Sequence, residues 1–138
     1  MNGYEGPLDI PLLGDLIAQA VEGFARDHDL QYDLWYHNEP VWLVWREVRG
    51  EGYTQEVQIA AFRTKEGEYL FFIPQAYRFE EETVHTTPPA AGNIVQRPLR
   101  DFCPLTDIPT VIRDVQELVA QAWSAVEAFK KIDVTHQL

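Results

Sequence analysis

Residues 30–48, LQYDLWYHNEPVWLVWREV, decide the architecture of this chain, because they predict two strands joined by a short turn. Residues 30–37 alternate in polarity and are rich in aromatic rings, a composition typical of strands. Asn38 and Glu39 provide the turn, and a second strand follows over residues 41–49. A turn this short requires its two strands to run antiparallel. The stretch therefore predicts a β-hairpin.

Two further strands extend the hairpin into an antiparallel meander over residues 30–79. A glycine-marked turn at residues 50–52 leads into a third strand over residues 53–63. After another short turn, a fourth strand is predicted over residues 68–73. Pro74 either ends it or lies at a sheet edge, because proline cannot donate to a ladder, and residues 75–79 are available to resume the strand.

Amphipathic helices are predicted on either side of this sheet, over residues 9–28 and 108–131. In both, apolar residues recur at spacings of three and four, which gathers them on one face. Asp9 and Asp107 are expected to cap the two N-termini. Residues 132–138 are expected to form a frayed tail.

The segment between the sheet and the second helix, residues 80–107, contains several prolines and is expected to be a long irregular crossover. Residues 93–97 are available for a short fifth strand. The chain is therefore predicted to be an α+β two-layer sandwich, a four- to five-stranded antiparallel meander with both helices packed on one face. Loops of this length are uncommon in compact domains and are often functional, so the crossover is a candidate wall of a pocket.

Pairing the strands through their turns predicts which side of the sheet is the core. Leu34 is expected opposite Leu43, Leu43 opposite Ile59, and Ile59 opposite Phe72. The face defined in this way is almost wholly apolar and should receive both helices. Its members are Tyr32, Leu34, Tyr36, Val41, Leu43, Trp45, Val57, Ile59, Ala61, Leu70 and Phe72. A shift of one residue in any strand would exchange the two faces of that strand.

The opposite face is predicted to be polar at one end, where Arg46 opposes Glu56, and aromatic at the other. The residues expected at the aromatic end are Trp35, Trp42, Phe62, Tyr69 and Phe71, with His37 beside them. Patches above about 300–600 Å² are rare on monomers, so a cover is expected. The sequence leaves three alternatives for what covers the patch. They are the crossover, with Ile94, Val95 and Phe102 as plugs; a second copy of the chain; or a separate protein, peptide or small ligand.

Composition limits the function. The chain has 138 residues, the length of one domain (residues 1–138), and 46% of them are apolar, enough for a core. Lys and Arg number 11 against 22 Asp and Glu, and this net charge of −11 argues against binding nucleic-acid phosphates. The apolar runs are shorter than the ~20 residues of a membrane helix, and the first residues do not resemble a signal peptide. We expect a cytoplasmic protein without nucleic-acid or membrane partners.

The sequence offers little catalytic chemistry. Residues 27–29, Asp-His-Asp, and Asp33 carry metal-ligand side chains, but they lie at a helix end and a strand start, so no metal site is predicted. His37 has no assigned carboxylate partner, and the single cysteine, Cys103, shares only the crossover with His85. The sequence contains no glycine-rich phosphate loop or nucleophile elbow, so no cofactor is predicted.

These observations favour a non-enzymatic module that forms a homodimer or binds a protein partner through the aromatic face. The alternative is a small-ligand-binding or catalytic protein with a pocket between the sheet and the crossover. In that case His37, His85 or Cys103 would supply the reactive group.

Two family resemblances are visible in the order of elements. A small acidic α/β chain with a long amphipathic C-terminal helix resembles type III secretion chaperones, which implies a third candidate, an acidic secretion-chaperone-like protein. Those chaperones usually carry a helix between strands three and four, where this chain has only residues 64–67, Thr-Lys-Glu-Gly. The order helix, strands, helix also resembles the acidic frataxins. Neither resemblance assigns a role to a residue.

Overall fold

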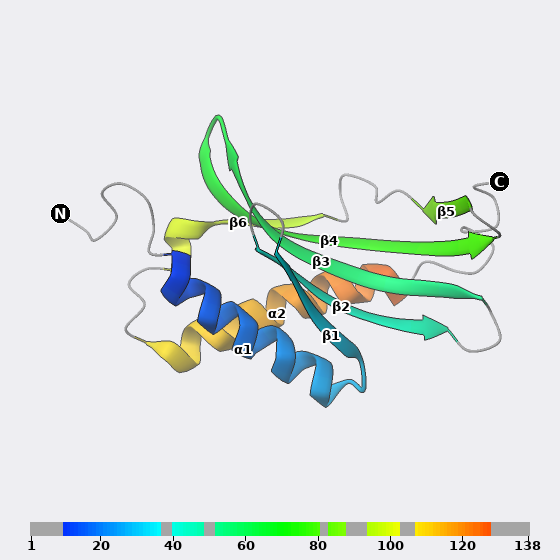
Figure 1. Cartoon of the computed structure of the whole chain (residues 1–138). Coiled ribbons are helices and arrows are strands. Elements are labelled where there is room, and N and C mark those ends of the chain that lie inside the picture. Colours follow the sequence, from blue (N-terminus) through cyan, green and yellow to red (C-terminus); the bar gives the residue numbers. More distant parts are fainter. Residues whose placement is uncertain are drawn as a thin grey trace.

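The structure is a computed structural model and describes residues 10–36, 40–48, 52–80, 83–87, 94–102 and 107–127. The elements, in chain order, are α1 (Ile10–Asp27), β1 (Gln31–Tyr36), β2 (Pro40–Val48), β3 (Tyr53–Thr64), β4 (Gly67–Glu80), β5 (Thr83–Thr87), β6 (Val95–Pro98), the 3-10 helix η2 (Leu99–Phe102) and α2 (Ile108–Glu127). The two long helices lie side by side under one antiparallel sheet (Figure 1). The predicted α+β arrangement of helix, strands and helix is confirmed.

The sheet has six strands, and its last two occupy the same edge. Strands β1 to β4 pair in sequence order as a meander. β5 pairs antiparallel with residues 76–80 of β4, and β6 pairs antiparallel with residues 69–72. β5 and β6 therefore act as two pieces of one edge strand, and Pro74 of β4 lies between the two paired stretches. The expectation of an irregular segment over residues 80–107 is wrong for β5 and η2, whereas β6 corresponds to the short strand for which residues 93–97 were available.

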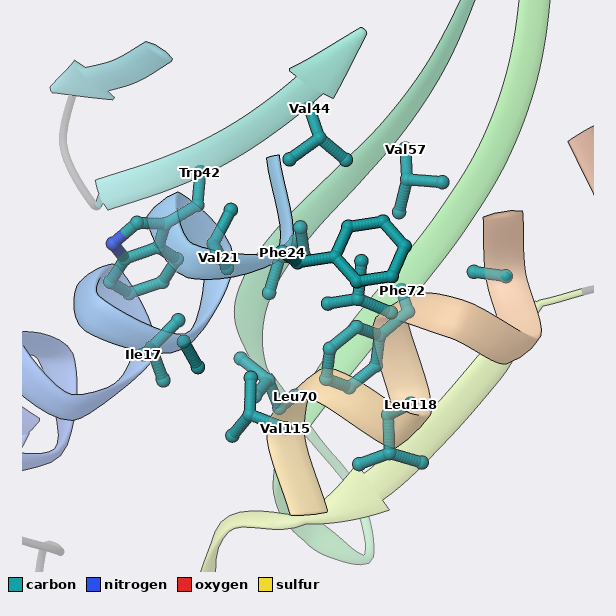
Figure 2. Packing of buried hydrophobic residues seen from close by; sticks show 14 of the residues in the cluster. Ile17, Val21, Phe24, Trp42, Val44, Val57, Leu70, Phe72, Val115 and Leu118 are labelled. Carbon is teal, nitrogen blue, oxygen red and sulfur yellow. The ribbon is translucent and has the colours of Figure 1, made fainter. Parts of the chain in front are cut away.

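The core fills the space between the helices and one face of the sheet. α1 packs against β1 and β2, and α2 packs against β3 and β4. Figure 2 shows Trp42, Val44, Val57, Leu70 and Phe72 pointing from the sheet towards side chains of both helices. The helices contribute the apolar stripes predicted from their spacing, with Trp123 in addition; the buried members larger than alanine are Leu13, Leu16, Ile17, Val21, Phe24, Val111, Val115, Leu118, Val119, Trp123 and Val126.

The predicted register is correct between β3 and β4 but wrong for β2. Ile59 lies opposite Phe72 as expected. Trp42, however, lies opposite both Leu34 and Ile59, so β2 is displaced by one residue relative to both neighbours. Three residues, and not four, connect the paired positions Tyr36 and Pro40. The shift turns the even-numbered residues of β2 towards the helices.

The change of face corrects six assignments in β2. Trp42 and Val44, predicted on the outer face, belong to the core. Val41, Leu43 and Trp45, predicted in the core, lie on the outer face. Arg46, predicted opposite Glu56 on the outer face, lies on the helix side. There its guanidinium carbon is 5.5 Å from the ring centre of Trp123, and its Nη2 is 3.7 Å from Glu127 Oε2.

Two helix ends are capped within the described residues, the start of α2 as expected from the sequence and the end of α1 by a motif that the sequence did not predict. At the start of α2, the backbone N–H of Thr110 donates to Asp107 Oδ1 at 3.3 Å, which confirms the predicted cap. α1 ends in a Schellman motif: the N–H of Leu30 donates to the carbonyl of Ala25 at 2.8 Å, while Asp29 has a φ of 55°. Asp9, the end predicted for α2 at 131 and the tail at 132–138 lie outside the described residues.

Candidate functional site

The face of the sheet turned away from the helices is ordered in rows that cross the strands. Opposed residues share a face, so the pairing gives each row directly. The central row holds Trp35, Val41, Ala60 and Phe71 in β1 to β4. Towards the β3–β4 turn the next row holds Phe62 and Tyr69. Away from that turn the rows become polar and contain Asp33, Gln58, Glu56 and Gln75.

We call Trp35, Phe62, Tyr69 and Phe71 the outer aromatic patch. The centres of the Phe62 and Phe71 rings are 5.5 Å apart, and those of Tyr69 and Phe71 are 6.2 Å apart, so the three form a contiguous cluster. Trp35 is 63% exposed and Phe62 is 48% exposed, among the most exposed large apolar residues of the described chain. The patch lies where the β3–β4 hairpin rises away from the helix layer (Figure 1).

The structure removes Trp42 from the predicted site. Its side chain is only 3% exposed and points towards α1, as Figure 2 shows. A Cβ added at Gly14 of α1 would lie 3.7 Å from Trp42 Cζ2, which places the indole directly against the helix backbone. His37, the other candidate beside the patch, lies outside the described residues. Four of the predicted aromatic residues are therefore brought to one face, and the fifth is a core residue.

The described part of the crossover does not serve as the predicted cover. Leu99 and Phe102 of η2 are buried in the core cluster, and Val95 of β6 packs against that cluster. Arg97 has its guanidinium carbon 5.0 Å from the ring centre of Phe102 and its Nη1 3.9 Å from Asp114 Oδ2 on α2. These contacts place the plug residues Val95 and Phe102 on the helix side of the sheet, opposite to the outer aromatic patch.

A buried carboxylate lies at the polar end of the outer face. Glu56 is 5% exposed and accepts hydrogen bonds from neutral donors: Gln58 Nε2 at 3.3 Å, the hydroxyl of Tyr77 at 3.4 Å and the side-chain amide of Gln75. Within the described residues, no Lys or Arg side chain forms an ion pair with it. Burial, followed by the charge of Glu56, raises the pKa of Tyr77 to about 12.

The residues predicted to line a reactive pocket are not brought together by the described structure. His85 lies in β5, opposite Arg78 of β4, and Cys103 lies outside the described residues. Among the residues that the structure describes, no three His, Cys, Asp or Glu side chains gather as metal ligands do. His28, which the sequence places in an acidic stretch, donates from Nδ1 to the Phe24 carbonyl at 3.0 Å and stacks on the Phe24 ring.

Sequence reasoning missed the apolar floor of the outer face. Leu43 and Ala60 are buried there, and Val41 and Ile73 are half-buried beside them. They lie between Trp35 of β1 and the rings of β3 and β4, so the apolar surface continues across four strands. The signal for this floor was present in residues 41–45, Val-Trp-Leu-Val-Trp, which are apolar at every position and so predict a strand that is apolar on both faces.

Comparison with family models, curated proteins and solved structures gave no match. None of the described helices has the length and apolar character needed to span a membrane. The assignment of function therefore rests on the chemistry of the outer face.

Proposed function

We propose that this protein is a non-enzymatic interaction module that binds a protein chain, either a second copy or a different protein, through the outer face of its sheet. The exposure of Phe62 beside the rings of Tyr69 and Phe71, and of Trp35 on the same face of β1, carries the proposal. Removing such rings from water on binding is favourable in proportion to the area buried. Aromatic anchors of this kind contribute most of the energy at protein interfaces.

The outer aromatic patch is itself a rigid surface, which supports its use in binding. Its four residues come from β1, β3 and β4, and the neighbouring residues Leu70 and Phe72 on the reverse face are fully buried. A patch held on paired strands loses little conformational entropy when it binds, which favours affinity. A cytoplasmic location belongs to the same proposal and is supported by the presence of a single cysteine in the sequence.

Two variants of the patch test the proposal, Trp35→Ser and Phe62→Ser. Leu12→Ser is the matched control, because Leu12 is 46% exposed on α1, away from the outer face. Self-association is measured by light scattering over a range of concentration. For binding to other chains, peptides that bind the wild-type protein are first selected from a random library, and their affinity for each variant is then measured. We expect either patch variant to weaken association about ten-fold or more, or ~1.4 kcal/mol, and the control to leave it unchanged. Association that survives both patch variants would reject the proposal.

Trp42→Ala is not a test of this surface. The indole lies in the core against α1, so its removal should lower the free energy of unfolding by about 3–5 kcal/mol through lost burial and a cavity. Trp35→Ala should change it by about 0.5 kcal/mol or less, as is usual for exposed positions. Urea unfolding of the two variants, followed by circular dichroism, measures this contrast. Equal losses would mean that the β2 register described above is wrong.

A further inference from the structure

We propose that the outer face binds a protein segment that carries arginine or lysine side chains among apolar ones, and not a second copy of this chain. The inference rests on the proposed function and adds the chemistry of the partner. Three observations support it: the sign of the charges on the outer face, the way the helix side of the same sheet satisfies its arginines, and the buried carboxylate of Glu56.

Among the side chains that the structure describes, the charges on the outer face have one sign. The pairing of β1 to β4 and β6 places three ionisable carboxylates there, those of Asp33, Glu47 and Glu56. Of the outer-face positions whose side chains the structure describes, none is Lys or Arg. The sheet arginines whose side chains the structure describes, Arg46, Arg63 and Arg97, lie on the other face, and each pairs with a carboxylate of this chain.

The helix side shows how this chain holds a guanidinium. Arg46 lies 5.5 Å over the ring of Trp123 and pairs with Glu127. Arg97 lies 5.0 Å over the ring of Phe102 and pairs with Asp114. Each group combines an aromatic ring, a guanidinium and a carboxylate, which joins a cation–π contact to an ion pair.

The outer face presents the ring and the carboxylate without the cation. Asp33 and Trp35 are two residues apart on β1 and therefore share this face, and both are exposed. Trp45 lies opposite Glu56 in the next strand. Trp is the ring that attracts a cation most strongly. A basic side chain of a partner would complete either pair, while apolar residues of the same partner cover Phe62 and Phe71.

Glu56 adds an observation independent of the exposed acids. Its carboxylate is buried, and its hydrogen-bond donors are two amides and a hydroxyl, all neutral. A buried carboxylate is normally paired with a cation, because desolvation of an unpaired charge is costly. A cation placed over this part of the sheet would be attracted through a medium of low dielectric.

The same charges disfavour a second copy as the occupant. Two outer faces laid together would bring carboxylates of Asp33, Glu47 and Glu56 from each copy into one interface, and like charges placed across an interface repel. The whole chain carries a net charge of −11, which adds long-range repulsion between copies. A cationic segment is attracted by both terms.

The test uses three fluorescent peptides of equal length that alternate valine and phenylalanine with arginine, with serine or with glutamate. Affinities are measured by anisotropy at about 0.15 M salt, where distant charges are screened. We expect the arginine peptide to bind the wild type about ten-fold more tightly than the serine peptide, and the glutamate peptide to bind most weakly. Asp33→Asn with Glu47→Gln should remove most of the arginine preference. Glu22→Gln with Glu117→Gln, which removes the same charge from exposed positions on the helices, should retain it.

Each other outcome has a defined meaning. If both double variants lose the preference equally, binding follows net charge and the inference fails. If the arginine and serine peptides bind equally, and Trp35→Ser weakens both, the partner chemistry is wrong while the proposed function stands. If Trp35→Ser affects neither peptide and no self-association depends on it, both proposals fail. A dimer that is lost in Trp35→Ser shows that a second copy is the occupant and overturns the inference alone.

Discussion

The side chain of Gln55 joins the sheet to the last described turn of α2. Its Nε2 donates to the main-chain carbonyl of Val126 at 3.2 Å, across 71 positions of the sequence, and its Oε1 accepts from Arg46 Nε at 2.9 Å. The amide is buried, so the Val126 carbonyl has no ready substitute partner in water. The same Arg46 lies over Trp123 and pairs with Glu127. One polar side chain thus fixes the end of the helix against β2 and β3.

We expect Gln55→Leu to lower the free energy of unfolding by about 1–3 kcal/mol, because it leaves the buried Val126 carbonyl without its donor and also removes the acceptor of the Arg46 Nε. Urea unfolding followed by circular dichroism measures the change. Gln96→Leu, at an exposed position of β6, is the control and should cost about 0.5 kcal/mol or less. Equal effects of the two substitutions would show that the buried hydrogen bonds contribute nothing.

Two glycines of α1 should respond differently to alanine. A Cβ at Gly14 would make an ordinary contact with Trp42 Cζ2 at 3.7 Å, so Gly14→Ala should raise the free energy of unfolding by up to about 1 kcal/mol through helix propensity. A Cβ at Gly23 would lie 3.0 Å from Gln116 Nε2, which donates to the Ala20 carbonyl at 3.2 Å. Gly23→Ala should therefore raise the free energy of unfolding by less than Gly14→Ala, or not at all. Thermal unfolding of both variants decides the order, and a more stable Gly23→Ala would contradict it.

Asp29 occupies a backbone conformation that glycine adopts more easily. Its φ of 55° closes the Schellman motif at the end of α1, a position where a side chain carries a steric cost. We expect Asp29→Gly to stabilise the protein by about 0.5–1 kcal/mol and Asp29→Val to destabilise it by at least as much. Denaturant midpoints provide the measurement. A stabilising valine would show that this conformation is not retained in solution.

Tyr77 should set an alkaline limit to stability. Its pKa is raised to about 12, chiefly by burial and then by the Glu56 carboxylate, from an ordinary value of 10.0. The raised folded-state pKa means that the unfolded state loses the proton first, so the free energy of unfolding should fall as pH rises between about 10 and 12. Below that window the contribution is complete. Tyr77→Phe should flatten this part of the pH dependence, and so should Glu56→Gln, in urea unfolding at stepped pH. An unchanged slope in both variants would contradict the assignment.

The sequence was sufficient to predict the positions of the two helices, because their apolar residues recur with one helical period and Asp107 marks the start of α2. It was also sufficient for the β3–β4 register, since Thr64 pairs with Gly67 around two turn residues and so leaves one alignment. It failed for β2, where residues 41–45 are apolar on both faces. With no polar side to identify, the pattern cannot distinguish one register from the next.

Four of the five aromatic residues predicted for the outer face lie there. The fifth, Trp42, was misplaced because the register of β2 could not be read from the sequence. Trp35, Phe62, Tyr69 and Phe71 come from strands with an interpretable alternation or a fixed turn, whereas Trp42 comes from β2. The hydrogen bonds of the Gln55 side chain depend on contacts with the far end of the chain, which no local pattern reveals. β5, in contrast, had a usable signal in residues 83–87, Thr-Val-His-Thr-Thr, whose β-branched side chains are typical of strands.

The helix layer has a consequence for the synthesis of the protein. α1 covers β1 and β2, while α2, which is made last of all the elements, covers β3 and β4. A ribosome that has translated β4 has already released a chain with the apolar faces of Val57, Ile59, Leu70 and Phe72 uncovered. Such surfaces favour aggregation or chaperone binding until their partner emerges. A chain that ends before Ile108, or a ribosome that pauses there, should therefore expose a surface that aggregates or binds chaperones. The completed chain should bury that surface once α2 leaves the exit tunnel.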